Sequence, residues 1–120
     1  MFQLPRMIEQ LQSYRHRAPV IVAVEPNPEP ERLQWWEAAA QPAAEAGALV
    51  VLFTPIPVTL RNAMAYMDPE LSRWAPQASW AWILDAYLEP RACLDAVRLD
   101  PDLLGRILAW VEGIQHECPE

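Results

Sequence analysis

The sequence predicts a single α/β domain built on a four-stranded mixed sheet flanked by helices, with an extra helix at the N-terminus. Short β-branched runs alternate with stretches of helical apolar spacing, which is typical of parallel strands joined by crossover helices. The last two runs are separated by only a tight turn, which indicates an antiparallel hairpin. The 120 residues suit one domain, with an N-terminal helix (1–17), a core (18–116) and a tail (117–120).

The first half of the chain predicts a helix, a strand and a second helix. Leu4–Arg17 has apolar residues at helical spacing between polar ones, so it is expected to be an amphipathic helix over one face of the domain. Pro19–Val24 is a continuous apolar run, typical of a strand buried on both faces. After a proline-rich segment, Pro30 suits the first turn of a helix that runs toward Gly47. Pro42 is expected to kink this helix or end it early.

The second half predicts the remaining strands and two more helices. Ala48–Phe53 is a second buried strand, and the apolar spacing of Thr59–Arg73 predicts a helix. Ser79–Leu84 and Arg91–Leu99 are the third and fourth strands, antiparallel to one another. Asp100 is placed to cap a closing helix.

Charge and hydropathy exclude several classes of function. The net charge is −7, and all nine basic residues are arginine, which argues against a protein that binds nucleic-acid phosphates. The same composition argues against a basic membrane-surface helix. The longest apolar stretches are shorter than the roughly 20 residues needed to span a bilayer. We therefore expect no membrane insertion and a cytoplasmic location.

The order of elements resembles the thioredoxin fold, in which a βαβ half is joined to a ββα half. The C-terminal third is more specific, and the segments that carry the likeness are Trp82–Tyr87, Leu99–Asp102, Leu108–Gln115 and Cys118–Glu120. These segments resemble the end of bacterial redoxins of the alkyl hydroperoxide reductase/thiol-specific antioxidant type, a peroxiredoxin-like family. The resemblance also implies that Pro76 precedes the third core strand, where such proteins often have a cis proline facing the active site.

The segment where this family carries its attacking cysteine departs from the pattern. Glu25–Arg32 follows the first core strand and contains no cysteine but three glutamates. Carboxylates raise the pKa of a nearby thiol, whereas a redox centre needs that pKa lowered. The resemblance therefore implies a degenerate member without the active-site cysteine. Glu25, Glu29 and Glu31 are expected to form a solvated rim.

The two cysteines occupy other places. Cys93 lies on the predicted fourth strand among apolar residues, where a free cysteine behaves as a small buried hydrophobe. Cys118 lies near the C-terminus beside His116, either as an incidental thiol in a tail, as a thiol that pairs with another chain, or as a soft metal ligand. The spacing of the cysteines forms no zinc motif, and the three glycines form no phosphate-binding loop. No metal or cofactor is predicted.

Tryptophan is abundant, with six in 120 residues. Trp35 and Trp36 are consecutive on a predicted helix, so their side chains cannot both point into the core. Tryptophan is enriched at the centres of protein interfaces. The sequence thus predicts a partner-binding surface with these members: Trp35, Trp36, Pro26, Pro28, Pro30 and Pro76.

These observations favour a redox-inactive, thioredoxin-like adaptor without a catalytic residue, acting as an accessory subunit of a larger protein assembly. A homodimer is compatible with this interpretation. The alternative is a peroxiredoxin-like thiol oxidoreductase or antioxidant enzyme that uses Cys118. A third interpretation is a small-molecule binder near Glu25 and Pro55, at the carboxyl ends of the parallel strands.

Overall fold

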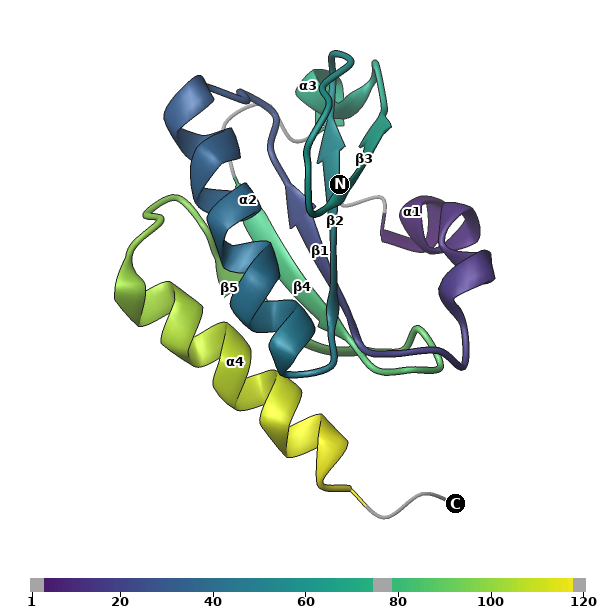
Figure 1. Cartoon of the computed structure of the whole chain (residues 1–120). Helices are drawn as coiled ribbons and strands as arrows, with labels where there is room; N and C mark the ends of the chain where they lie inside the picture. Colours follow the sequence, from purple (N-terminus) through teal and green to yellow (C-terminus); the bar gives the residue numbers. More distant parts are fainter. Residues whose placement is uncertain (1–3, 75–78, 118–120) are drawn as a thin grey trace.

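The computed structural model describes residues 4–74 and 79–117, and it shows a five-stranded mixed sheet between two layers of helices (Figure 1). The spatial order of the strands is β3-β2-β1-β4-β5. β1, β2 and β3 run parallel, whereas β4 is antiparallel to β1, and β5 is antiparallel to β4. The strands are β1 (Val20–Val24), β2 (Leu49–Thr54), β3 (Met64–Met67), β4 (Trp80–Leu84) and β5 (Pro90–Asp95).

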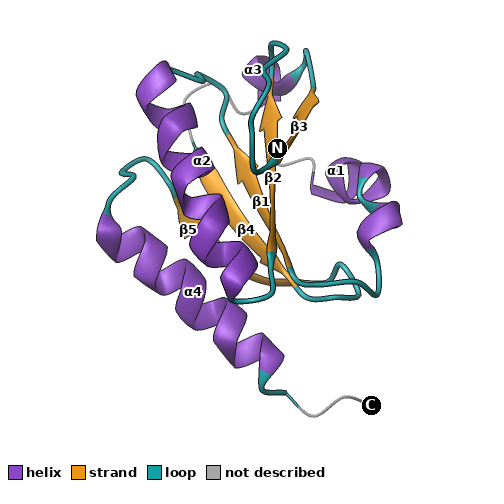
Figure 2. Cartoon of the chain, viewed as in Figure 1, coloured by secondary structure: helices purple, strands orange, loops and turns teal. Residues whose placement is uncertain are grey.

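Helices cover both faces of this sheet (Figure 2). The two long helices, α2 (Pro30–Glu45) and α4 (Pro101–Gln115), pack on one face. The short helix α1 (Leu4–Gln10), the 3-10 turn η1 (Gln12–Tyr14) and the single-turn helix α3 (Leu71–Trp74) lie on the other. The predicted α/β fold class is confirmed. No helix in the two described ranges is long and apolar enough to cross a membrane.

β1 lies at the centre of the sheet, and all five of its side chains are buried. Ile21 and Ala23 face the core under α2 and α4. Val20, Val22 and Val24 face the core under α1. The predicted strand buried on both faces is therefore confirmed, since its alternate residues contribute to two separate cores.

The predicted four-strand count and the helix over Thr59–Arg73 are wrong. Met64–Met67 forms β3, which pairs in parallel with the outer side of β2, and only Leu71–Trp74 is helical in that segment. The ring of Tyr66 stacks on Phe53 of β2 with centroids 5.5 Å apart. Pairing with the free side of β2 stabilises these four residues as a strand. Apolar spacing alone does not distinguish a strand from a helical turn in so short a run.

The helix boundaries agree in part with expectation. Leu4–Arg17 is helical only to Gln10, and the η1 turn follows. α2 continues past Pro42 to Glu45, so the proline does not end it early. Gly47 follows with a φ of +90°, the left-handed conformation that glycine adopts most readily. Asp100 caps α4 as predicted, because its carboxylate accepts a hydrogen bond from the backbone N–H of Leu103.

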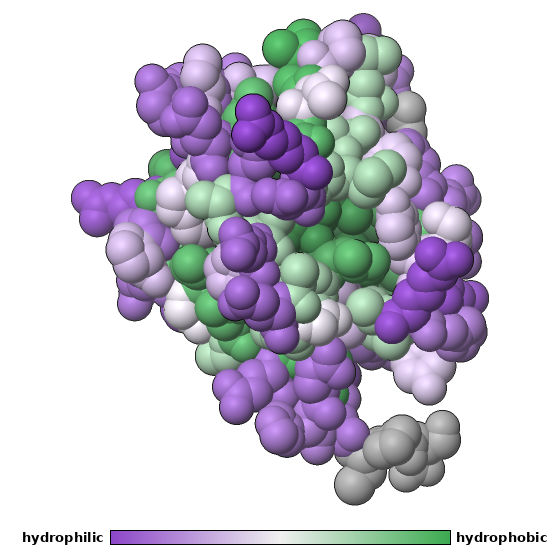
Figure 3. All heavy atoms as spheres, viewed as in Figure 1, coloured by the Kyte–Doolittle hydropathy of each residue, from purple (hydrophilic) through white to green (hydrophobic). Residues whose placement is uncertain are grey.

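A hydrophobic hollow of about 290 Å³ lies on the surface beside β2, which we call the β2 hollow. Figure 3 shows hydrophobic surface in the space between α2 and α1. β2 is longer than β3, so in the described part of the chain its first residues have no strand beside them on that side. The hollow lies at this step in the sheet, and its lining includes Ala40, Ala44, Leu49, Leu60, Ala63 and Met64.

Candidate functional site

Glu25 follows the last residue of β1 and is fully buried, at the place where the family resemblance would require redox chemistry. Its backbone N–H donates to the carbonyl oxygen of Phe53, which extends the pairing of β1 with β2 by one residue. The prolines that follow end the strand, and Pro30 begins α2. This sharp change of direction holds the Glu25 side chain between the sheet and the first turns of α2.

Arg32, in the first turns of α2, neutralises this buried carboxylate. Its Nε donates to Oε1 of Glu25 at 2.6 Å, and a terminal guanidinium nitrogen donates to Oε2 at 2.8 Å. The guanidinium also reaches the loop after β5. Its other terminal nitrogen, Nη1, donates to the carbonyl oxygen of Val97 at 2.9 Å, and Nη2, which already donates to Oε2 of Glu25, also donates to the carbonyl oxygen of Ala96. The guanidinium of Arg32 thus pairs with the buried carboxylate of Glu25 and also holds in place the loop after β5, which is distant in sequence.

Two further donors complete the coordination of Glu25. The indole Nε1 of Trp36 donates to Oε2 at 2.7 Å, and the hydroxyl of Ser79 donates to Oε1 at 3.0 Å. Each carboxylate oxygen therefore accepts two hydrogen bonds. We call Glu25, Arg32, Trp36 and Ser79 the Glu25 cluster. With two donors on each oxygen, the Glu25 carboxylate has no open hydrogen-bonding position for a substrate, so the cluster is built as a structural clamp.

The expectation that Glu25 belongs to a solvated rim is wrong, whereas Glu29 and Glu31 are exposed. The cluster was missed because sequence reasoning treated the three glutamates as equivalent. A signal was available: Glu25 directly follows a strand buried on both faces, and Arg32 lies in the next helix. A carboxylate in that place must be paired, and the arginine seven residues later is the nearest cation.

The residues of the predicted partner surface differ in their exposure to solvent. Trp36 and Pro26 are buried, so neither presents its side chain to a partner. Trp35 is partly buried and meets Trp36 edge-on, with ring centroids 4.9 Å apart. Pro28 is partly exposed, and Pro30 is exposed. Pro76, and with it the expected proline of the third core strand, lies outside the described residues.

Cys93 is exposed on the edge strand β5, which corrects its expected burial. Within the described residues, β5 is the last strand on its side of the sheet, so residues between its two ends remain accessible to solvent. Partial burial of the thiol and the neighbouring Asp95 carboxylate raise the pKa of Cys93 to about 11. The thiol is therefore protonated near neutral pH, which disfavours nucleophilic chemistry. Cys118 lies outside the described residues.

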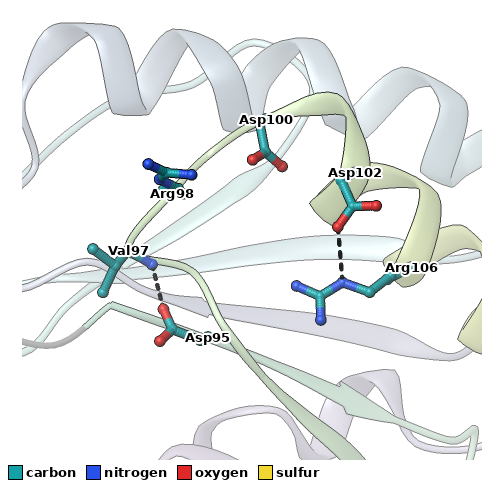
Figure 4. A pocket seen from close by; sticks show the side chains of 6 residues that line it. All are labelled: Asp95, Val97, Arg98, Asp100, Asp102 and Arg106. Carbon is teal, nitrogen blue, oxygen red and sulfur yellow. Dashed lines mark hydrogen bonds and ion pairs between the residues drawn. The ribbon is translucent and has the colours of Figure 1, made fainter.

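A second hollow of about 480 Å³ lies between the end of β5 and the start of α4 (Figure 4). Several of the charged side chains that line it are already engaged in local structure. Asp95 accepts a hydrogen bond from the N–H of Val97, and Asp102 pairs with Arg106 at 3.6 Å. No group of three or more histidine, cysteine, aspartate or glutamate residues in the described ranges could hold a metal ion.

Comparison with known proteins shows similarity in fold. No protein-family model matches the sequence, and no curated protein matches it significantly. Among solved structures, peroxiredoxin Q of Xanthomonas campestris is 12% identical, with a TM-score of 0.65 over 86% of this chain and 83% of that chain. Prx1a of Plasmodium yoelii is 11% identical, with a TM-score of 0.70 over 91% and 83%. The reduced 2-Cys peroxiredoxin of Plasmodium vivax is 12% identical, with a TM-score of 0.68 over 88% and 70%.

These similarities confirm that the chain has the thioredoxin-like fold found in peroxiredoxins. Within that fold, the segment after the first core strand contains no cysteine, and the carboxylate of Glu25 is held there by three partner side chains. The chain therefore shares the scaffold and differs at the place that the resemblance identifies with thiol chemistry.

Proposed function

We propose that this chain, a thioredoxin-like domain of the peroxiredoxin type, is a redox-inactive adaptor that binds another protein. The observation that carries the proposal is the saturated carboxylate of Glu25 in the segment where the resemblance implies an attacking thiolate. A buried ion pair that is hydrogen-bonded on every side stabilises one rigid conformation of that segment. Rigidity of this kind suits a surface that docks a partner without performing chemistry.

The proposed docking surface lies around the start of α2. It combines the partly exposed Trp35 and Pro28 with Pro30 and Val97, and the Val97 side chain is 58% exposed. Arg32 connects these parts, since it lies in α2 and donates to the carbonyl oxygen of Val97. The proposed partner is another protein, because exposed apolar and proline side chains on a rigid segment are typical of protein–protein interfaces.

The first test is for thiol chemistry. Peroxide consumption in the presence of a dithiol reductant should equal the buffer rate for the wild type, Cys93→Ser and Cys118→Ser. The reason is that the segment after β1 has no thiol and that the Cys93 thiol has a raised pKa. A known peroxiredoxin assayed in parallel provides the positive control. Turnover that disappears in Cys118→Ser would establish the enzyme alternative and overturn the proposal.

The second test is for the partner. We expect the chain, tagged and produced at its natural level in its own cells, to co-purify with a protein in fixed stoichiometry. Val97→Glu should reduce that recovery by at least about tenfold, because a charge is placed in an apolar contact. Tyr87→Glu is the matched control, since Tyr87 is 49% exposed in the β4–β5 turn, away from the proposed surface. Equal recovery with Val97→Glu and Tyr87→Glu would refute the surface.

A further inference from the structure

The β2 hollow is lined by backbone groups of the sheet as well as by apolar side chains. Leu49, the first residue of β2, directs its N–H toward β1 and donates to the carbonyl oxygen of Pro19 at 3.0 Å. Successive residues of a strand direct their backbone groups to opposite sides, so the C=O of Ala48 and both groups of Val50 point away from β1. Both residues line the hollow, and these groups therefore face it.

Two of these backbone groups have no partner in the described part of the chain. β3 begins at Met64, which lies opposite Val51, so the parallel ladder supplies the carbonyl oxygen of Val50 with the N–H of Met64. It supplies nothing to the N–H of Val50 or to the carbonyl oxygen of Ala48, and no turn or loop of the described ranges bonds to either. Val50 is 5% exposed and Ala48 is 2% exposed. Since an unmet backbone group at a buried residue is costly, a ligand that satisfies both groups gains binding free energy.

The spacing of this open pair determines what a ligand must offer. In a parallel sheet, the N–H and the C=O of one residue bond to two residues of the next strand that are two positions apart. The carbonyl oxygen of Ala48 and the N–H of Val50 have this separation. A ligand that carries an amide N–H and a carboxylate on the same carbon atom therefore matches them, as a residue that continued β3 would.

The charges at the hollow favour a ligand with one negative charge. Arg61 lines the hollow and is exposed, and its guanidinium forms no ion pair with another described residue. The nearby carboxylate of Glu37 accepts from the backbone N–H of Arg61 at 2.5 Å, which leaves the guanidinium available. Asn62 adds a side-chain amide that can donate to a carboxylate. None of the described residues that line the hollow is acidic, so an ammonium group on the ligand would have no counter-charge there.

The apolar lining and the volume limit the rest of the ligand. Ala40 and Ala44 of α2 have small side chains that leave room, and Leu49, Leu60 and Met64 complete an apolar surface around the open pair. The volume of about 290 Å³ lies at the lower end of the range for small-molecule sites, about 300–1,000 Å³. The hollow therefore suits a ligand of about the size of one acylated amino acid with an apolar side chain.

We propose that the β2 hollow binds a small monoanion, an N-acylated apolar amino acid. The amide N–H of the ligand donates to the carbonyl oxygen of Ala48, and its carboxylate accepts from the N–H of Val50 and pairs with the guanidinium of Arg61. Its acyl group and side chain cover the apolar lining. The site lies at the amino end of β2, whereas Glu25 follows the carboxyl end of the parallel strand β1, so the ligand site and the Glu25 cluster lie at opposite ends of the sheet.

Calorimetric titration of the full chain with N-acetyl-L-leucine tests the proposal, and we expect saturable binding of one ligand per chain. Three altered ligands should each bind at least about tenfold more weakly. N-acetyl-N-methyl-L-leucine lacks the N–H, N-acetyl-L-leucine amide lacks the charge, and L-leucine adds an ammonium group. In NMR spectra, the amide signal of Val50 should shift more on titration than that of Leu49, whose N–H already donates to Pro19.

Two matched pairs of variants locate the site. Ala44→Phe should fill the hollow and abolish binding, whereas Ala38→Phe is the control, since Ala38 is also exposed on α2 but does not line the hollow. Arg61→Gln should weaken binding at least about tenfold, and Arg106→Gln on α4 should leave it unchanged. Circular dichroism checks that every variant is folded.

The proposal is overturned if the wild type shows no saturable binding, if Ala44→Phe still binds, or if the three altered ligands bind as tightly as N-acetyl-L-leucine. A tetrapeptide ending in leucine that binds more tightly than N-acetyl-L-leucine would also overturn it, and would assign the hollow to the C-terminus of a partner chain. The adaptor proposal is tested separately, because its surface lies around the start of α2, whereas Ala40 and Ala44 lie toward the end of that helix.

Discussion

Replacing Glu25 with glutamine should lower the free energy of unfolding by about 3–5 kcal/mol, the usual cost of removing one partner from a buried ion pair. The side chain keeps its size, so the loss reports on charge and hydrogen bonding. Both carboxylate oxygens accept from two donors, and the amide nitrogen of glutamine would face donors at either position. Arg32, 19% exposed, would lose its only carboxylate partner in the described part of the chain.

Urea denaturation followed by circular dichroism measures this effect. Glu29→Gln is the matched control, because Glu29 lies in the same segment and is exposed. Its effect should stay within about 0.5 kcal/mol, as for most surface substitutions. Equal stability of the two variants would show that the Glu25 cluster does not stabilise the fold.

Trp36→Ala should destabilise the protein by about 3–5 kcal/mol, because it opens a cavity in the core under α2 and α4. Trp36→Phe should cost less, about 1–3 kcal/mol, since one aromatic ring still fills part of the site, while the five-membered ring and its N–H donor to Glu25 are lost. Comparing the two variants shows how much of the loss comes from the whole aromatic side chain and how much from the part that carries the donor.

Thermal unfolding followed at 222 nm measures both Trp36 variants without relying on tryptophan fluorescence, which the substitutions themselves alter. Trp110→Ala serves as the control, because Trp110 is 42% exposed on α4. A Trp36→Phe variant as stable as the wild type would mean that the indole N–H contributes nothing, and that Glu25 is held by its other partners.

Most of the fold could be predicted from local patterns. The buried strands β1 and β2 and the capped helix α4 have signals that depend only on neighbouring residues: continuous apolar runs, and an aspartate before a proline and an apolar stripe. β3 could not be predicted in this way. Its four residues form a strand because β2 has an open side, and that requirement arises only after the chain has folded.

The Glu25 cluster at the candidate site also depends on residues that are far apart in the sequence. Its four members come from residues 25, 32, 36 and 79, and the last of these lies far along the chain. The absence of a cysteine from this segment can be read from the sequence. The burial of Glu25 is indicated only by its place directly after a strand buried on both faces, whereas its bond to Ser79 depends on how the second half of the sheet packs and has no local signal.

The range of sequence separations within the Glu25 cluster has a consequence for the order of folding. Glu25 bonds to Arg32 and Trp36 across 7 and 11 residues, whereas its bond to Ser79 spans 54 residues and the bond of Arg32 to Ala96 spans 64. Short loops close at lower entropic cost than long ones, so the β1–α2 half of the cluster can assemble first. It then presents an oriented carboxylate and guanidinium to the later β4–β5 half. We infer that the bonds from Glu25 to Ser79 and from Arg32 to Ala96 form last, once the second half of the sheet has packed against the first.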